Sequence, residues 1–417
     1  LDVVDIDGAV NMATTLLVTG NVDFNGDLDV DGTTNLDVVD IDGAVDMAST
    51  LTLAGNADFN GNLDVDGTTD LDGLTVAGNL SVDGGTIKLD GNYPTGTNNV
   101  ALGDIALADG SLSGGNNTAI GRSSLYSNTS GANNTGIGSG ALENNTTAAS
   151  NTAVGYHSLL ANTTGADNVA VGATSLDANT TGAENVAVGK SSLTGNTTGD
   201  FNTAVGENAL ANNTTADNNT AIGRRAMLAN TTGTGGVAVG TSALAANTTG
   251  DYNIAIGLNA LDENTTGTQN TALGLSCLGS NTTGGFNNAL GVGALANNTT
   301  AGNNTAVGHS ALNANTTGGL NTAVGAFALE SNTTGEFNVA MGYEALEENT
   351  TADSNSAFGY RALTANTTGA SNTAVGSLSL DANTTGSSNT AVGENALGAN
   401  TTGSNNAAFG EGSLLKN

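Results

Sequence analysis

The chain has 417 residues, of which 61 are Gly, one is Pro, 14 are Phe or Tyr, and none is Trp. So few large side chains cannot fill the thick core of an ordinary globular domain, and we expect a thin, regular interior instead. The 39 acidic residues outnumber the 7 basic ones, for a formal net charge of −32 at pH 7. Such a surface repels nucleic acid and anionic lipid, and no apolar run reaches the roughly 18–20 residues of a membrane span. We therefore expect no nucleic-acid partner and no membrane insertion by this chain.

Residues 1–90 contain 18 of the acidic residues, all of them Asp. The stretch LDVVDIDGAVNMATTLLVTGNVDFNGDLDVDGTTN (1–35) recurs with few changes at 36–70, and a partial third copy follows. Alternation such as Leu28-Asp29-Val30-Asp31 is typical of strands, and Asn-Gly and Asp-Gly pairs mark tight turns. The sequence therefore predicts an intertwined, acidic β shaft of 35-residue repeats over 1–90, followed by a linker over 91–97.

Within the first of these repeats, DLDVDG (27–32) resembles the opening of a calcium-binding loop. Such a loop carries oxygen ligands at alternate positions before a Gly, and an acid at its twelfth position. The ligands here would be Asp23, Asn25, Asp27, Asp29 and Asp31. Val38 stands where the twelfth-position acid is required, and the second copy replaces Asp27 with Asn62. The alternative is a strand whose Asp side chains face water, so calcium is the one candidate cofactor and none is required.

Residues 98–417 repeat with a shorter period, as in SNTAVGYHSLLANTTGA (150–166). Nineteen glycines that each end an AVG-like triplet follow one another at 17 residues, after one first step of 18. These anchor glycines are Gly103, Gly121, Gly138, Gly155, Gly172, Gly189, Gly206, Gly223, Gly240, Gly257, Gly274, Gly291, Gly308, Gly325, Gly342, Gly359, Gly376, Gly393 and Gly410. A strictly kept length is typical of a solenoid, because one extra residue would put every later side chain out of register. Positions within a repeat are numbered below from the anchor glycine, which is position 0.

Each repeat holds a small set of recurrent residues around its anchor. Val or Ile usually stands at −1, Leu at +4 and Asn at +7, and Thr-Thr follows with a small residue that is Gly or, in four repeats, Ala. Because Asn, Thr and Gly end helices, we expect two short strands, one around NTAVG and one around the Ala-Leu pair, closed by a turn at NTTG. Val and Leu are expected to form the core. Tolerance of Ala indicates that the NTTG turn needs a small side chain rather than positive φ.

One coil cannot repay the conformational entropy of its own ordering, so stacking of coils and a second buried face are required. The recurrent Ala beside Val and Leu predicts such a face, flat enough for close approach by another chain. We therefore predict an all-β fold: a β-solenoid of 19 coils over 98–417, with the shaft before it, assembled as a homotrimeric fibre. At 4.7–4.9 Å for each coil, the solenoid would be a rod of roughly 90 Å.

The phrase NTAVG…AL…NTTG resembles the repeats in the heads of trimeric autotransporter adhesins, the YadA-like left-handed parallel β-roll. Similar 17-residue arrays occur in phage tail-fibre-like proteins, and LTVAGNLSVDGG (74–85) is similar to phage fibre shafts. The head resemblance covers residues 98–417 and implies a left-handed roll in a trimeric fibre. This repeat is longer than the usual adhesin-head unit and the chain holds no heptad stalk, which favours a fibre.

Variable positions are the ones that can meet a partner, because the recurrent ones are committed to the coil. They lie at +1, +2, +5, +6, −6 and −5. Five repeats carry a bulky apolar residue at −5, namely Phe201, Tyr252, Phe286, Leu320 and Phe337. Tyrosines at +1 are Tyr156, Tyr343 and Tyr360. We expect these side chains to contact a partner, either by packing between chains or by stacking on a sugar.

Other chemistry-bearing residues favour structural roles. The Asn-Thr-Thr runs are glycosylation sequons, but stacked Asn and Thr at turns are expected to form hydrogen-bonded ladders instead. Cys277 takes a slot that Ala fills in neighbouring repeats, and as the sole cysteine it cannot form an intrachain disulfide. His157 and His309 have no partners at the spacing of a metal site or a catalytic triad. The sequence therefore predicts that the protein is not an enzyme.

These patterns lead to one functional expectation with two alternatives. The chain is expected to be a structural and adhesive extracellular fibre, on a virion or a bacterial cell surface, that displays a region binding a cell-surface glycan or protein receptor. The alternatives are a ligand-binding solenoid, for a glycan or for ice, and a passive spacer rod. Because the chain begins at Leu1 rather than Met, we expect a processed or truncated product.

Overall fold

The computed structural model describes residues 9, 12–15, 17–22, 97–109 and 112–415. The chain divides into two compact units, Leu1–Asp83 and Gly84–Asn417. The predicted shaft lies outside the described residues except for a few positions before residue 23, and the five calcium candidates lie wholly outside them. The fold is therefore that of the second unit.

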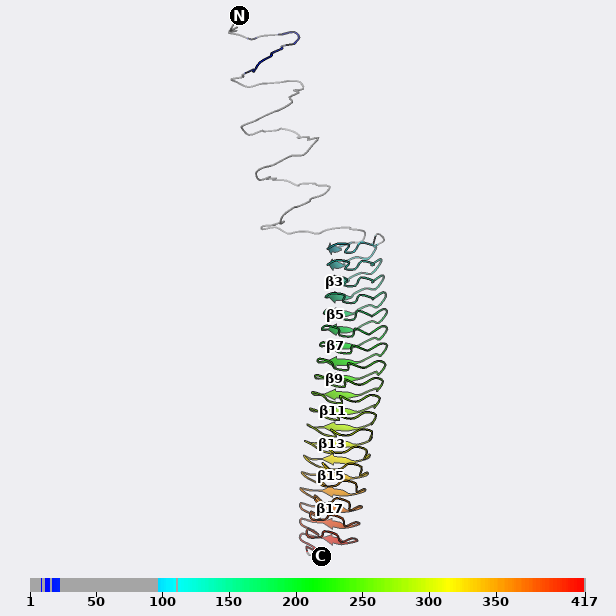
Figure 1. Ribbon diagram of the computed structural model, residues 1–417, viewed down its shortest axis with the longest axis vertical. Coiled ribbons are helices and arrows are strands. Elements are labelled where there is room, and N and C mark those ends of the chain that lie inside the picture. Colours follow the sequence, from blue (N-terminus) through cyan, green and yellow to red (C-terminus); the bar gives the residue numbers. More distant parts are fainter. Residues whose placement is uncertain (1–8, 10–11, 16, 23–96, 110–111, 416–417) are drawn as a thin grey trace. The chain divides into compact units, whose positions relative to one another are not determined.

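The described residues of the second unit form an all-β parallel solenoid of 17-residue coils (Figure 1). Each coil contributes one three-residue strand, and the strands stack into one 19-stranded sheet along one side of the coils. The strands in this part of the chain are β1 (Val100–Leu102), β2 (Thr118–Ile120), β3 (Thr135–Ile137), β4 (Thr152–Val154), β5 (Val169–Val171), β6 (Val186–Val188), β7 (Thr203–Val205), β8 (Thr220–Ile222), β9 (Val237–Val239), β10 (Ile254–Ile256), β11 (Thr271–Leu273), β12 (Asn288–Leu290), β13 (Thr305–Val307), β14 (Thr322–Val324), β15 (Val339–Met341), β16 (Ser356–Phe358), β17 (Thr373–Val375), β18 (Thr390–Val392) and β19 (Ala407–Phe409).

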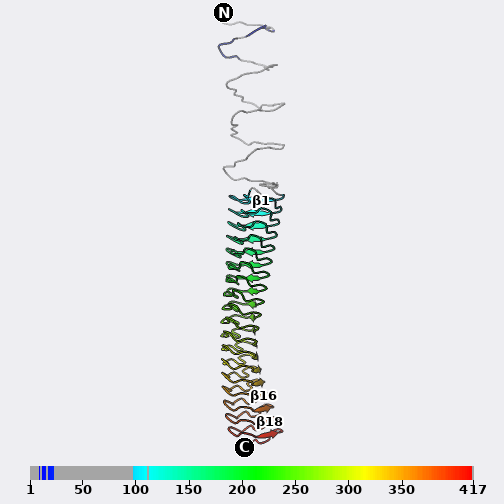
Figure 2. The ribbon, with the colours of Figure 1, turned by 90° about the vertical axis from the view of Figure 1, so that its right-hand side faces the viewer.

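Every strand pairs in parallel with the strand of the next coil, without a shift of register. In β4 and β5, for example, Ala153 lies opposite Ala170 and Val154 opposite Val171. Side chains at the same position in successive coils therefore stack in columns along the rod. Figure 2, turned by 90° from Figure 1, shows the coils as a single stack. The predicted 17-residue solenoid is confirmed.

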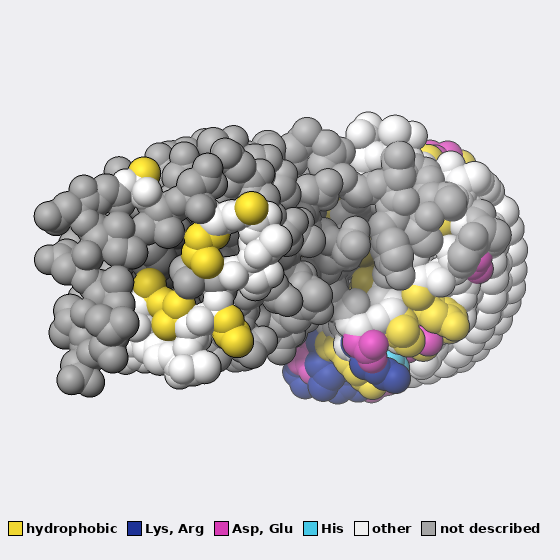
Figure 3. All heavy atoms as spheres, turned by 90° about the horizontal axis from the view of Figure 1, so that it is seen from above, with side chains coloured by type: hydrophobic (Ala, Val, Ile, Leu, Met, Phe, Trp, Pro, Cys, Tyr) yellow, Lys and Arg dark blue, Asp and Glu magenta, His cyan; other side chains and the backbone are white. Residues whose placement is uncertain are grey.

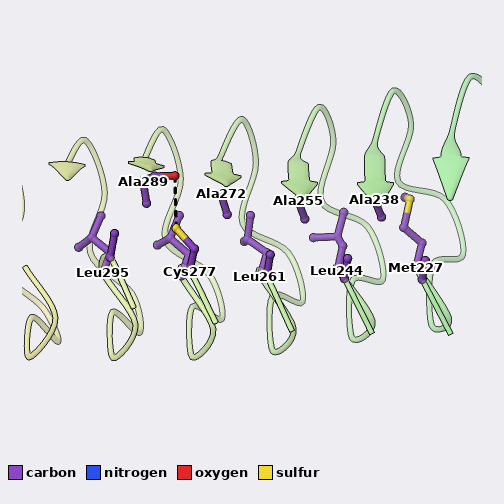
Figure 4. Packing of buried hydrophobic residues seen from close by; sticks show 14 of the residues in the cluster. Met227, Ala238, Leu244, Ala255, Leu261, Ala272, Cys277, Ala289 and Leu295 are labelled. Carbon is purple, nitrogen blue, oxygen red and sulfur yellow. Dashed lines mark hydrogen bonds between the residues drawn. The ribbon is translucent and has the colours of Figure 1, made fainter. Parts of the chain in front are cut away.

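The interior of the described coils is filled by Ala at −2 and Leu at +4, except that Gly136 takes the first place in one coil and Met227 the second place in another. Figure 4 shows the Ala side chains of the strands pointing toward the Leu side chains across the coil. Ala255 and Leu261, for example, are fully buried. The expectation that Val at −1 is buried is wrong, because only the central residue of a three-residue strand points inward and its two neighbours point out. The expectation that the recurrent Ala forms the face between chains is wrong for the same reason.

The second predicted strand, around the Ala-Leu pair, is also absent from the described coils. In its place residues at +2 and +4 take positive φ, as at Ser123 (56°) and Leu125 (52°). This alternation folds the chain too tightly for a strand. Hydrogen bonds still join neighbouring coils there, since Leu125 N–H donates to the Ala141 carbonyl at 3.0 Å.

Every anchor glycine has positive φ, and all but the last, Gly410, lie where a Cβ would meet the backbone of the next coil. Gly206 has φ +135°, and a Cβ on it would lie 2.6 Å from the carbonyl carbon and oxygen of Gly223 in the next coil. Gly199, in the NTTG turn, has no positive φ, and its equivalent is Ala216 in the next coil, only 4% exposed. The prediction that the NTTG turn needs a small residue rather than positive φ is confirmed.

Candidate functional surfaces

Two columns of Asn run through the interior on either side of the apolar core. At +7, Asn162 donates its Nδ2 hydrogens to Asn145 Oδ1 and to the Gly165 carbonyl, both at 2.9 Å. At −4, Asn151 also donates to the Gly165 carbonyl at 2.9 Å, and its backbone N–H donates to Asn134 Oδ1 at 2.9 Å. Each coil is thereby tied to its neighbours by side-chain amides as well as by the sheet.

These ladders occupy the sequon Asn. Every +7 Asn from Asn128 to Asn400 is at most 2% exposed. An amide that is buried and whose two hydrogens are both donated cannot carry a sugar in the folded rod. The predicted Asn ladders are confirmed.

The two threonines that follow the sequon Asn differ in how far they are exposed. Thr163 is half-buried, and its hydroxyl donates to the Thr180 carbonyl at 3.0 Å. Thr164 is exposed, as is the second Thr of nearly every described coil. The turns thus present one fully exposed column of Thr.

The outward face of the sheet is a continuous uncharged surface, which we call the strand face; it consists of positions −3 and −1. None of the 38 residues at these positions is charged, and every −1 residue is Val, Ile, Leu, Met or Phe. They are exposed or half-buried; Ile256, Leu273 and Leu290 are 37–46% exposed. The sequence reasoning missed this face, although the lack of any charge at two positions in 19 repeats was a usable signal.

Charge is confined to other columns. All five Lys and Arg among the described residues lie at +1 or +2, and Figure 3, an end-on view, shows the Lys and Arg of the coils gathered along one edge. Three of them pair with an acid of the preceding coil: Arg122 with Asp104 at 3.9 Å, Arg224 with Glu207 at 3.6 Å, and Arg361 with Glu344 at 3.2 Å. Exposed pairs of this kind stabilise little, so these residues remain available to a partner.

Aromatic rings form a second feature at +1 and +2. Tyr156 stacks on His157, with ring centroids 3.8 Å apart. Over four successive coils His309, Phe327, Tyr343 and Tyr360 make a continuous ring ladder, with centroid distances of 5.2, 5.9 and 5.8 Å. Tyr156, Tyr343 and Tyr360 are 44–55% exposed, so their rings face outward.

The five bulky residues at −5 are exposed and hold an unfavourable backbone conformation. Their φ values are 56–61° and their exposed fractions 51–59%. Most other coils place Asn, Asp, Ser, Gln, Glu or Gly there. The left-handed region costs an L-residue without a locally bonding side chain roughly 1–2 kcal/mol. A side chain kept at such a cost, yet half exposed, is a candidate contact residue.

Four of these five coils also carry a large apolar residue at +1 or +2, on the other edge of the strand face. The pairs are Tyr252 with Leu258, Phe286 with Val292, Leu320 with Phe327, and Phe337 with Tyr343. The fifth, Phe201, shares its coil with Glu207. We call residues 252–343 the wide segment, because here the apolar surface extends beyond the strand face on both edges.

The side of the coils at +5 and +6 is polar and hollowed. One shallow hollow of about 290 Å³ is lined by Asn259, Asp262, Glu263, Ser276, Gly279, Ser280, Ala296 and Asn297. Burial, and then the charge of Glu263, raise the pKa of Asp262. Burial and the neighbouring Glu344 likewise raise the pKa of Glu347. These carboxylates are crowded with like charge, so anions would be repelled from this side.

Among the described residues, the thiol and the potential metal ligands are not arranged for a reaction. Cys277 is fully buried and its thiol donates to the Ala289 carbonyl at 3.2 Å (Figure 4), with its pKa raised to about 12 by burial. A protonated thiol inside the core is inert. Within the described residues no three His, Cys, Asp or Glu side chains group as a metal site.

No family model and no curated protein matches this chain. The resemblance to adhesin heads and tail fibres therefore rests on the repeat residues alone. Among the residues that the structure describes, no helix is long and apolar enough to cross a membrane.

Proposed function

We propose that the chain is the subunit of a homotrimeric, extracellular, structural and adhesive fibre whose coils form a left-handed roll. The observation that carries the proposal is the strand face, which is uncharged and continuous over 19 coils and apolar in every coil at position −1, in a chain with a net charge of −32. Apolar surface left open on this scale marks an interaction site.

The size of this face supports association between copies. At about 4.8 Å for each coil and 3.3 Å for each strand residue, it measures roughly 90 by 10 Å, or about 900 Å². A stable protein interface buries about 800 Å² on each partner. Cyclic packing of three rods would turn every strand face toward the common axis and leave the charged columns toward solvent.

The adhesive role is assigned to residues that such packing leaves outside. Tyr156 and Tyr360 lie in coils whose −5 residue is Ser, and Tyr360 stacks on Tyr343 at the end of the wide segment with ring centroids 5.8 Å apart. Their rings, with the acidic +5 and +6 columns, suit a neutral glycan or a protein receptor on a cell surface. The fibre would act on a virion or a bacterial surface.

Sedimentation equilibrium of the purified chain tests the assembly. Three chains for each particle at micromolar concentration is the expected result. A monomer at all concentrations would contradict the proposal and would favour a ligand-binding solenoid.

A further inference from the structure

A second hollow on the +5 and +6 side of the rod has charged residues at its two ends and apolar residues between them. Its volume is about 330 Å³, and it shares Asp262 and Glu263 with the hollow described above. Arg225, at +2 of a coil two repeats earlier, lines its other end. At about 4.8 Å for each coil, the coils that carry the two ends are roughly 10 Å apart along the rod. We call this hollow the charged hollow.

Small side chains create the charged hollow. Ala245 and Ala246 occupy +5 and +6 of its middle coil, and no other coil in the sequence has Ala at both positions. Leu228 and Ala229 line it from the preceding coil. All four residues are half-buried, so the floor between the two charged ends is apolar and still partly open.

The charged groups at the two ends have no partner within the chain. Among the described residues, Arg225 has no acid within ion-pair distance, whereas its neighbour Arg224 pairs with Glu207 at 3.6 Å. The carboxylates of Asp262 and Glu263 make no hydrogen bond or ion pair in the same part of the chain. Burial and the charge of Glu263 raise the pKa of Asp262, and the charge of Arg225 lowers it. The two ends therefore act on each other across the hollow without contact.

We propose that the charged hollow binds a zwitterionic ligand, with its carboxylate on Arg225, its ammonium group on Asp262 and Glu263, and an apolar linker over the Ala floor. The planar guanidinium group of Arg matches a carboxylate, and an ammonium group donates hydrogen bonds to acids. The acids repel a ligand with only a negative charge, and Arg225 repels one with only a positive charge. A ligand that carries both charges at a distance is therefore selected over either.

The charged hollow stays open when copies of the chain associate. Positions +5 and +6 directly follow the core Leu, and Figure 4 shows Leu244 and Leu261 across the coil from Ala238 and Ala255 of the strands. Packing through the strand face therefore leaves this side toward solvent. The proposal goes beyond the adhesive fibre and holds for a single rod as well as for an assembly. The zwitterion is either a free small molecule or a pair of oppositely charged side chains on a receptor protein.

Titration of the purified chain with 6-aminohexanoate, followed by saturation-transfer NMR of the ligand at neutral pH, tests the proposal. This probe holds an ammonium group and a carboxylate at the two ends of a methylene chain. Hexylamine and hexanoate carry one charge each, and free glycine carries both charges too close together to reach both ends. 6-Aminohexanoate should bind about fivefold more tightly than each of these three compounds. Absence of binding would overturn the proposal. Equal binding of hexylamine would also overturn it, because it would reflect only the net charge of −32.

Variants test whether the probe binds in the charged hollow. Arg225→Gln and Asp262→Asn should each weaken binding about fivefold, and Ala245→Leu should weaken it by filling the floor. Two controls should leave binding unchanged, with circular dichroism to confirm folding of every variant. Arg224→Gln removes the adjacent charge outside the hollow, and Glu347→Gln removes a +5 acid from a coil that has no Arg two repeats before it. Equal losses in test and control variants would overturn the assignment to this hollow.

A competition titration distinguishes the two sources of the zwitterion. The peptide Lys-Ala-Asp, capped by acetyl and amide groups, carries its two charges on side chains alone. Displacement of 6-aminohexanoate by this peptide would support a receptor protein as the source. Binding of 6-aminohexanoate without displacement by the peptide would support a free small molecule.

Discussion

The buried and the exposed positions of the coils differ in how much their residues vary from one coil to the next. Inside, the Ala, Leu and Asn columns barely vary, and each residue is fixed by contacts to the coils before and after it, as Asn162 is by Asn145 and Gly165. Outside, the +1 column holds Asp, Arg, Lys, Glu, Tyr, Leu and Val in turn without any change of the coil. The comparison teaches that the interior defines the rod, whereas the outer columns are free to define what it contacts.

The strongest way to break the interior is to add a side chain to an anchor. Gly206→Ala requires φ near +135° and places Cβ 2.6 Å from the Gly223 carbonyl group. Backbone strain and overpacking together should cost about 4 kcal/mol of unfolding free energy, measured by urea denaturation. Gly279→Ala is the control, because Gly279 has no positive φ and a Cβ there would lie 3.4 Å from its nearest neighbour, the Ser276 carbonyl oxygen, so it should cost less than about 1 kcal/mol. Equal losses in the two variants would show that the anchor conformation is not what the glycine supplies.

A local exception sharpens the account of the interior. The coil whose anchor is Gly240 has Gly236 at −4, where the other coils have Asn. The side chain of Met227 fills the space, and its Cε would lie 2.7 Å from a Cβ on Gly236. Gly236→Asn alone should cost about 2 kcal/mol through overpacking, and Met227→Leu alone should cost less than about 1.5 kcal/mol. The double variant restores the residues of the other coils and should recover most of the loss, a coupling of about 2 kcal/mol by denaturation. Additive losses would contradict this packing.

Much of the interior could be predicted from the residues, but not which of the two apolar strand residues, Ala at −2 or Val at −1, points into the coil. The 17-residue length, the strand at NTAVG and the Asn ladders all follow from repetition and turn chemistry. Hydrophobicity favoured Val154 over Ala153 as the core residue, yet the side chain of Leu159 fills the coil so that only Ala fits opposite it. Leu159 itself has φ 52°, which a branched apolar residue rarely adopts, so the predicted second strand was a reasonable but wrong inference.

The buried thiol gives the interior a pH dependence. The pKa of Cys277 rises from its ordinary 9.0 to about 12, chiefly because burial disfavours the thiolate. A raised folded-state pKa means that its contribution is fully present below pH 9 and is lost progressively between pH 9 and about 12. At pH 10 the chain should lose about 1 kcal/mol of unfolding free energy relative to pH 8, and Cys277→Ala should lack this part of the loss. Identical pH profiles of unfolding would contradict the thiol assignment.

Outward substitutions should leave stability almost unchanged while altering contact. Tyr156→Ser and Tyr360→Ser remove exposed rings, so unfolding free energy should move by less than about 0.5 kcal/mol. Attachment of the fibre to receptor-bearing cells should fall several-fold in a surface-binding assay. Substitution of the exposed Thr164 and Thr368 with Ser is the control and should leave attachment unchanged. Full attachment by the tyrosine variants would leave the rod as a spacer for a binding region elsewhere.

The most direct test of the account places charge on the strand face. Val188→Asp, Val205→Asp and Ile222→Asp together put three carboxylates on adjacent coils of that face, and Thr198→Asp, Thr215→Asp and Thr232→Asp put the same charge on the exposed Thr column of the same coils. Sedimentation equilibrium, with circular dichroism to confirm folding, should show dissociation toward folded monomers only for the strand-face variant. Unchanged mass in both variants, or equal dissociation in both, would contradict the claim that this face joins the chains.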